Sequence, residues 1–152
     1  MIGAYEGDLI RPLGLVTLYF AYAEGEIDEL LGVLNAQQSS PTPTLNWPVG
    51  QKISRALFLV QELKDPRLNG LIETLQEAQE LTGRRNQLVH GRLFAGGRLV
   101  SPNRNTPDIH ISAEDIEQLA ERIFSCKEYI FMHRCRHLLL ALGGNAGVSG
   151  GT

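Results

Sequence analysis

Apolar residues recur every three or four positions in four segments of the chain, and this spacing limits what it can fold into. The segments span approximately residues 13–34, 49–63, 66–89 and 113–142. A period near 3.6 residues places the apolar side chains of each segment along one face of an α-helix. Four such faces can close one core, so the sequence predicts an all-α fold, a four-helix up-and-down bundle.

The connections between these segments differ in kind. The first helix is expected to begin just after Pro12, and residues 36–48, rich in Ser, Thr and Pro, form a long crossover loop. Trp47 is expected to anchor this loop on the bundle. Before the fourth helix, the period changes: a Gly-Gly pair centres a short β-hairpin over 93–100, and 108–111 alternates like a further strand.

The fourth helix is expected to start at a capping box, with Ser112 as its N-cap. The chain of 152 residues suits one domain, which we assign to residues 1–142. Residues 143–152 are glycine-rich and are expected to form a frayed tail.

Charge is distributed unevenly along the chain. The formal net charge of −3 argues against attraction of the whole molecule to nucleic acid. Residues 81–107, however, contain no acid and five arginines: Arg84, Arg85, Arg92, Arg98 and Arg104. This stretch is either a solvated loop or a local site for an anion such as phosphate.

Sequence patterns also predict where the protein works. No run of about eighteen apolar residues is present, so no membrane span is expected. The first residues lack a basic region followed by an apolar stretch, so a secretory signal is not expected. Cys126 and Cys135 lie about 13 Å apart on one expected helix, too far for a disulfide. We therefore expect a cytoplasmic protein.

Two adjacent arginines near the end of the third segment have different surroundings. Arg84 follows Glu80 by four residues, the order that favours an intrahelical ion pair, and is expected to be a solvated surface charge. Arg85 occupies a position where the stripe predicts an apolar residue. It must be paired or face a cleft, because burying a bare guanidinium is unfavourable. Glu24 on the first helix is the expected partner, in a pair that is either part of a site or only a core staple.

His90 follows Arg85 by five residues. On a continuous helix this is about 140° of rotation and about 7.5 Å of rise, so one helix does not direct both side chains at one atom. They converge if the helix ends and His90 turns, or if a second subunit supplies another pair. Asn86 is expected to reach the imidazole and fix its orientation. A histidine at a helix end can also serve only as a cap.

The segment 85–90, Arg-Asn-Gln-Leu-Val-His, resembles the Arg-x4-His signature of HEPN domains, including the Asn that commonly follows the Arg. HEPN domains are four-helix bundles that carry this signature at a helix end. The resemblance extends from the first helix to the fourth. The hairpin after Leu-Val-His-Gly also resembles a bacterial branch of the family with many uncharacterised members.

The resemblance implies a metal-independent endoribonuclease that works as a homodimer, often a toxin or defence effector with an antitoxin protein as partner. RNA is cleaved when its 2′-hydroxyl attacks the adjacent phosphate. His90 would be the general acid or base, Arg85 would hold the phosphate charge, and Asn86 would orient the site or touch phosphate. Arg92, Arg98 and Arg104 would guide the RNA backbone. The alternative is a dimerisation or nucleotide/RNA-binding module without cleavage.

No metal or cofactor site is expected. His133 and His137 are spaced like metal ligands on a helix, but no carboxylate or second cluster accompanies them. We expect them to be cationic side chains near a helix end. Neither cysteine belongs to a Cys-x-x-Cys pair, and no phosphate-binding glycine loop is present.

Overall fold

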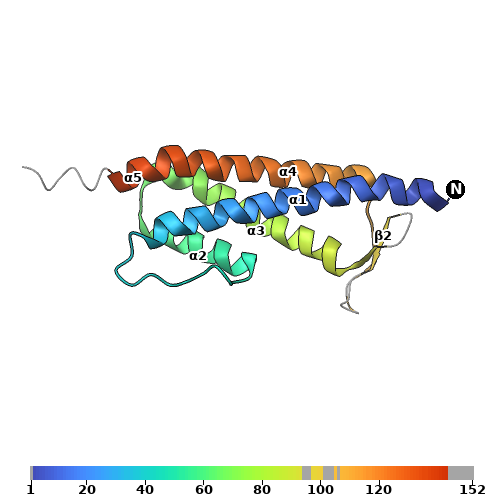
Figure 1. Cartoon of the computed structure of the whole chain (residues 1–152), viewed down its shortest axis with the longest axis horizontal. Helices are drawn as coiled ribbons and strands as arrows, with labels where there is room; N and C mark the ends of the chain where they lie inside the picture. Colours follow the sequence, from blue (N-terminus) through green and yellow to red (C-terminus); the bar gives the residue numbers. More distant parts are fainter. Residues whose placement is uncertain (1, 94–96, 101–104, 106, 144–152) are drawn as a thin grey trace, which may run out of the picture.

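The structure is a computed structural model that describes residues 2–93, 97–100, 105 and 107–143. Its four main helices are α1 (Ile2–Asn35), α2 (Val49–Glu62), α3 (Asn69–His90) and α4 (Ala113–His133). A 3₁₀ turn, η1 (Pro66–Leu68), precedes α3, and a π-helical turn, η2 (Arg134–Leu138), joins α4 to α5 (Leu139–Gly143). The predicted helical bundle with a hairpin insertion is confirmed (Figure 1).

The helices do not all alternate in direction. Lys52, near the start of α2, pairs with Glu24 and Asp28 in the second half of α1. The 36–48 loop therefore carries the chain back along the bundle, and α2 runs in the same direction as α1 (Figure 1). The up-and-down order of the prediction holds from α2 through α4, while the long loop makes the first connection a crossover.

α1 begins earlier than the sequence predicts, because the helix continues through Pro12. Proline inside a helix removes one backbone hydrogen bond and destabilises it by about 3 kcal/mol. Pro12 is buried, and Leu9, one turn earlier, packs against the core. Burial of these apolar side chains offsets the lost bond, so Pro12 lies inside the helix rather than before it.

The core lies where the four apolar stripes meet. Each helix contributes fully buried side chains, for example Leu30, Ile53, Leu71 and Ile116. Near the end of α3, Leu88 faces the core, while Val89 is 44% exposed. α1 and α4 lie side by side over most of the length of the bundle (Figure 1).

The insertion between α3 and α4 is a three-stranded antiparallel sheet at the end of the bundle where α4 begins (Figure 1). Its strands are β1 (Arg92–Leu93), β2 (Arg98–Val100) and β3 (Ile109–His110). Gly97 has a positive φ of 88°, and its carbonyl accepts a hydrogen bond from the Ile111 N–H at 2.7 Å. The predicted hairpin and further strand are therefore present; Gly96 lies outside the described residues.

α4 begins as predicted. The Ser112 hydroxyl accepts a hydrogen bond from the Asp115 N–H, and the Asp115 carboxylate accepts one from the Ser112 N–H. These bonds hold the pKa of Asp115 below its usual range. The predicted frayed tail lies outside the described residues, apart from Gly143 at the end of α5. In the described part of the chain, no helix combines the length and apolarity needed to cross a membrane.

Candidate functional site

The last two turns of α3 lie beyond the reach of α2. Val49, the first residue of α2, lines an internal cavity together with Phe20 and Thr82, so α2 begins at the level of Thr82. Residues 83–90 continue toward the hairpin without α2 beside them (Figure 1). The short α2 thus leaves the segment that carries Arg85 and His90 accessible from that side.

Arg85 lies partly buried against α1. Its Cζ atom is 4.4 Å from the centroid of the Phe20 ring, and its Nη1 donates a hydrogen bond to Asn86 Oδ1 at 3.1 Å. Its Nε is buried and has no hydrogen-bond partner among the described residues. Within the same set of residues, no carboxylate lies within ion-pair distance of Arg85. The positive charge is supported by an aromatic face but not neutralised.

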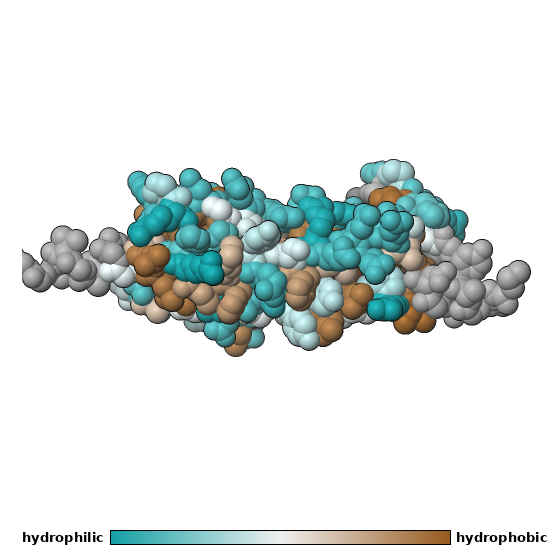
Figure 2. All heavy atoms as spheres, turned by 90° about the horizontal axis from the view of Figure 1, so that it is seen from above, coloured by the Kyte–Doolittle hydropathy of each residue, from teal (hydrophilic) through white to brown (hydrophobic). Residues whose placement is uncertain are grey.

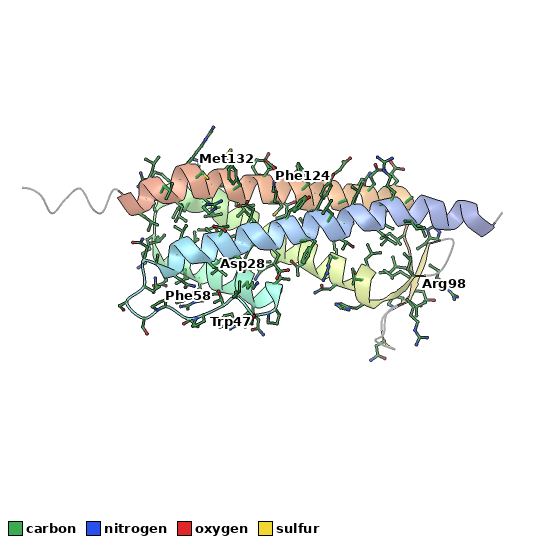
Figure 3. The ribbon with its side chains drawn as sticks, viewed as in Figure 1. Asp28, Trp47, Phe58, Arg98, Phe124 and Met132 are labelled. Carbon is green, nitrogen blue, oxygen red and sulfur yellow. The ribbon has the colours of Figure 1, made fainter. Side chains whose placement is uncertain are left out.

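The predicted Glu24–Arg85 pair is wrong. Glu24 Oε1 instead lies 3.2 Å from the Lys52 ammonium, which is also 2.8 Å from Asp28 Oδ1. Asp28 points from α1 toward α2 in Figure 3. The crossover loop brings α2 beside this half of α1, so Lys52 reaches Glu24 and Arg85 does not.

Lys52 is a buried cation that the sequence reasoning missed. Its side chain is only 2% exposed. Burial alone would lower the pKa of the ammonium, but hydrogen bonds to Asp28 and Glu24 outweigh it, and the pKa is raised above 10.5. The available signal was that Lys52 shares a helical face with Ala56 and Leu59, which are both buried. The same signal, a cation on an apolar stripe, had singled out Arg85.

Asn86 and His90 are not joined as expected. The Asn86 carboxamide oxygen is taken by Arg85, and no hydrogen bond between Asn86 and His90 occurs among the described residues. The His90 side chain is exposed at the last residue of α3. Since α3 stays helical through His90, Arg85 and His90 project from it in different directions.

The backbone after His90 is held in place by the sheet. A Cβ atom at Gly91 would lie 2.6 Å from the Gln87 carbonyl oxygen and 2.7 Å from Leu99 Cδ1. Only glycine fits this close approach of β2 to the end of α3 without a shift. The junction therefore fixes where His90 lies relative to the hairpin.

The predicted Arg84–Glu80 pair is not formed. Glu80 lies 3.8 Å from Arg122 on α4, which also binds Glu77 at 3.1 Å. The positive charge of Arg84 instead contributes to lowering the pKa of Asp115, after the larger effect of that residue's hydrogen bonds with Ser112. Tertiary packing of α3 on α4 has overridden the local pairing.

One face of the sheet carries the hairpin's cations. Arg92 is paired with Val100 and Arg98 with His110 in the strand register, so these four side chains share a face. Arg92, Arg98 and His110 are all exposed, and Arg98 lies at this end of the molecule in Figure 3. His110 was not among the predicted site residues, although strand alternation could have placed it there. Arg104 lies outside the described residues.

The other groups singled out from the sequence form no comparable site. The His133 and His137 rings lie 5.2 Å apart, and burial, with a contribution from His137, lowers the pKa of His133. In the described parts of the chain, no three His, Cys, Asp or Glu side chains gather closely enough to hold a metal. Burial raises the pKa of the Cys126 thiol to about 12, so it stays protonated and unreactive.

Trp47 is predicted to anchor the crossover loop on the bundle, and its side chain is largely buried there. Its ring is partly exposed and lines an open groove at the start of α2. The buried residue of the loop is Thr44, whose carbonyl accepts a hydrogen bond from the Trp47 N–H at 3.0 Å. A tight turn therefore holds this part of the loop and leaves the indole beside the groove.

No family model, no curated protein and no solved structure matches the chain. The chemistry of the site is therefore argued from its side chains. It combines a guanidinium without a carboxylate partner, a carboxamide bound to it, an exposed imidazole and a basic face on the sheet. Such groups can bind a phosphate and transfer protons near neutral pH.

Proposed function

We propose that the chain is a metal-independent endoribonuclease of the HEPN type, acting in the cytoplasm as a toxin or defence effector. The observation that carries this proposal is the environment of Arg85. Its guanidinium rests on Phe20 at 4.4 Å and no described carboxylate neutralises it, so its charge is available to a phosphate. The resemblance of residues 85–90 to the HEPN signature supports the same activity.

In the proposed reaction, the ribose 2′-oxygen forms a bond to the adjacent phosphorus and the bond to the 5′-oxygen breaks. The products are a 2′,3′-cyclic phosphate and a 5′-hydroxyl. His90 takes the proton from the 2′-hydroxyl or gives one to the leaving 5′-oxygen, and water carries the other of these two protons. Arg85 stabilises the charge on the phosphate oxygens. Asn86 holds the Arg85 guanidinium through their 3.1 Å hydrogen bond.

The proposal includes a homodimer, because one copy does not direct Arg85 and His90 at one atom. A second copy would supply the histidine that the Arg85 of the first copy lacks. Figure 2 shows apolar patches along one long edge of the bundle, and exposed apolar side chains on α1 and α4 include Leu18, Tyr22, Phe124 and Phe131. These residues offer apolar surface for the second copy. An antitoxin protein would act by covering the site.

The direct test is incubation of the purified protein with RNA in EDTA. We expect cleavage that leaves 2′,3′-cyclic phosphate ends, and a loss of about 10²–10⁴-fold in rate for His90→Ala. Arg84→Ala, a neighbouring arginine outside the proposed site, should keep most of the activity. RNA that stays intact at every protein concentration, or equal cleavage by His90→Ala, would contradict the proposal. A substrate with a single 2′-deoxy nucleotide should resist cleavage at that position.

A second candidate function is a dimerisation or nucleotide/RNA-binding module without cleavage, in which Arg85 only packs the bundle. The stacking of Arg85 on Phe20 favours it, because such contacts stabilise by about 0.5–2 kcal/mol. In that case Arg85→Ala lowers the melting temperature and Arg85→Met restores it. If Arg85→Ala melts like the wild type, the structural role fails. If Arg85→Met melts normally but cleaves no RNA, the endoribonuclease is favoured.

A further inference from the structure

A second cationic site lies at the start of α2, away from α4 (Figure 3). It is an open groove of about 410 Å³ lined by Trp47, Gly50, Gln51, Ser54 and Arg55. None of these residues belongs to the site proposed at the end of α3. An aromatic ring, a guanidinium, a carboxamide and a hydroxyl line one hollow, and groups of these kinds can together bind a nucleotide.

Arg55 has an unmet hydrogen-bonding need. Its Nε is buried and lacks a hydrogen-bond partner within the described residues, and no carboxylate in that set lies within ion-pair distance. Its Cζ lies 5.6 Å from the centroid of the Phe58 ring, which supports the cation without neutralising it. No Asp or Glu occurs between Glu29 and Glu62 in the sequence, so the chain around Arg55 supplies no local counter-charge. The Nε itself is enclosed by protein, but the Arg55 side chain is partly exposed and has no described counter-charge, so an anionic ligand in the groove can pair with the accessible part of the guanidinium.

The backbone at the start of α2 adds to this preference for an anion. Pro48 is the N-cap, and it offers no side-chain hydrogen bond to the first turn. Apart from Gly50 itself, its chain neighbours and the adjacent helix backbone, no described atom lies within 4 Å of the position that a Gly50 Cβ would occupy, so a ligand can approach the backbone there. The first N–H groups of a helix lack partners within the helix and attract negative charge.

The remaining lining residues differ in whether their polar groups are already hydrogen-bonded within the protein. The Ser54 hydroxyl is already used, because it donates to the Gly50 carbonyl at 3.1 Å and accepts from Gln79 at 3.0 Å. Gln51 is exposed, so its carboxamide can turn to the edge of a base. The partly exposed Trp47 ring offers a face on which a base can stack.

We infer that this groove binds a nucleotide, with its base stacked on Trp47 and its phosphate held by Arg55 and the start of α2. That the nucleotide belongs to an RNA strand rests on the function proposed above. Val49 precedes the groove residue Gly50 in the chain and lines a separate cavity together with Phe20, and Arg85 stacks on that Phe20 ring. An RNA strand bound at Arg85 could therefore place a neighbouring nucleotide in the groove.

The experiment uses the fluorescence of Trp47, the only tryptophan in the chain. The full-length protein is titrated with AMP, UMP, adenosine, inorganic phosphate and a 2′-deoxy tetranucleotide that cannot be cleaved. We expect saturable quenching by a nucleoside monophosphate and weaker binding of adenosine and phosphate. Because a charge-assisted hydrogen bond is lost, Arg55→Gln should weaken binding by about tenfold or more. Arg136→Gln, an equal charge change on the distant η2, should leave binding within about twofold of the wild type.

The outcomes separate this inference from the proposed function. Absence of saturable quenching by any nucleotide, or equal affinity in Arg55→Gln, overturns the inference, whether or not RNA is cleaved. Gln51→Ala provides a second variant, since this exposed side chain makes no hydrogen bond or ion pair with the described residues, and it should also weaken binding. If the protein binds nucleotides but cleaves no RNA, the result supports nucleotide binding in the groove and contradicts the proposed endoribonuclease activity. Tighter binding of the tetranucleotide than of AMP assigns the nucleotide to a strand, and equal affinity assigns it to a free ligand.

Discussion

At the scale of single residues, Lys52 and Arg85 show two ways in which a cation can occupy an apolar helix face. Lys52 is enclosed and bound to two carboxylates, so its charge is neutralised locally. Arg85 rests on an aromatic ring and a carboxamide, and its charge remains available. A guanidinium tolerates this position because it is planar and more weakly hydrated than an ammonium. The first cation therefore stabilises the bundle, and the second is suited to a ligand.

Replacing Lys52 with Ala should destabilise the protein markedly. The change leaves Glu24 and Asp28 facing each other without a cation and opens a cavity. Because the two carboxylates are 39% and 29% exposed, water relieves part of the effect, and we expect a loss of about 2 kcal/mol. Urea unfolding measures it. Lys127→Ala, which removes a surface pair with Glu128, is the control and should change stability by less than about 1 kcal/mol.

The same residue predicts a dependence of stability on alkaline pH. The pKa of Lys52 is raised in the folded protein above its usual value of 10.5. Its stabilisation is therefore complete below that value and disappears as the pH rises through the folded pKa. The difference in unfolding free energy between wild type and Lys52→Met should be constant near neutral pH and shrink above about pH 10.5. A difference that stays unchanged through pH 11 would contradict the assignment of the buried ammonium.

At the scale of elements, the junction between α3 and the sheet decides where His90 lies. Gly91 ends α3 with a φ of −75° and a ψ of 164°, which any residue can adopt. Glycine is required for steric reasons, since a Cβ atom at this position would clash with the Gln87 carbonyl oxygen and the Leu99 side chain. The hairpin therefore packs directly on the end of α3. This contact also fixes the position of the sheet face that carries Arg92 and Arg98.

Two glycine substitutions in α3 test this junction. Gly91→Ala should destabilise the protein and shift the hairpin, because the new methyl group meets backbone oxygens that cannot move independently. Gly83→Ala lies in open space within the same helix and should stabilise it by about 0.5–1 kcal/mol. Thermal unfolding and amide exchange at 92–100 compare the variants. Equal stability of the two would show that the sheet is not fixed by this contact.

At the scale of the whole molecule, an acidic protein carries a localised positive region. The net charge is −3, yet Arg85 and the sheet face with Arg92 and Arg98 lie toward one end. Attraction to RNA must therefore come from a few arginines rather than from the overall field. Such binding is strong at low salt and weakens quickly as ions screen it.

The salt dependence of RNA binding measures how many of these contacts form. About four arginine–phosphate contacts would give a slope near −3 when the logarithm of the affinity is plotted against that of the salt concentration. The double variant Arg92→Gln/Arg98→Gln should reduce the slope by about 1.4. Arg136→Gln, which removes an exposed arginine at the opposite end, should leave the slope unchanged. Fluorescence anisotropy with a 2′-deoxy oligonucleotide avoids cleavage during the measurement.

Local patterns predicted the helices because the spacing of apolar residues within each segment indicates which face of that helix is buried. The stripes of α1 and α4, the loop at 36–48, the strand at 108–111 and the Ser112 cap all depend on neighbours within a few residues. Pro12 was misjudged for the same reason, since local rules count the lost hydrogen bond but not the burial that compensates it.

The sequence by itself determined that four helices share one core, that a hairpin interrupts them and that a cation lies on the apolar face at Arg85. Periodicity and turn chemistry are local, so they can be deduced from neighbouring residues. Only the tertiary structure decided that Glu24 binds Lys52 and that Arg85 stacks on Phe20. The crossover loop aligns α2 with α1, and partners distant in the chain are chosen by this packing rather than by spacing.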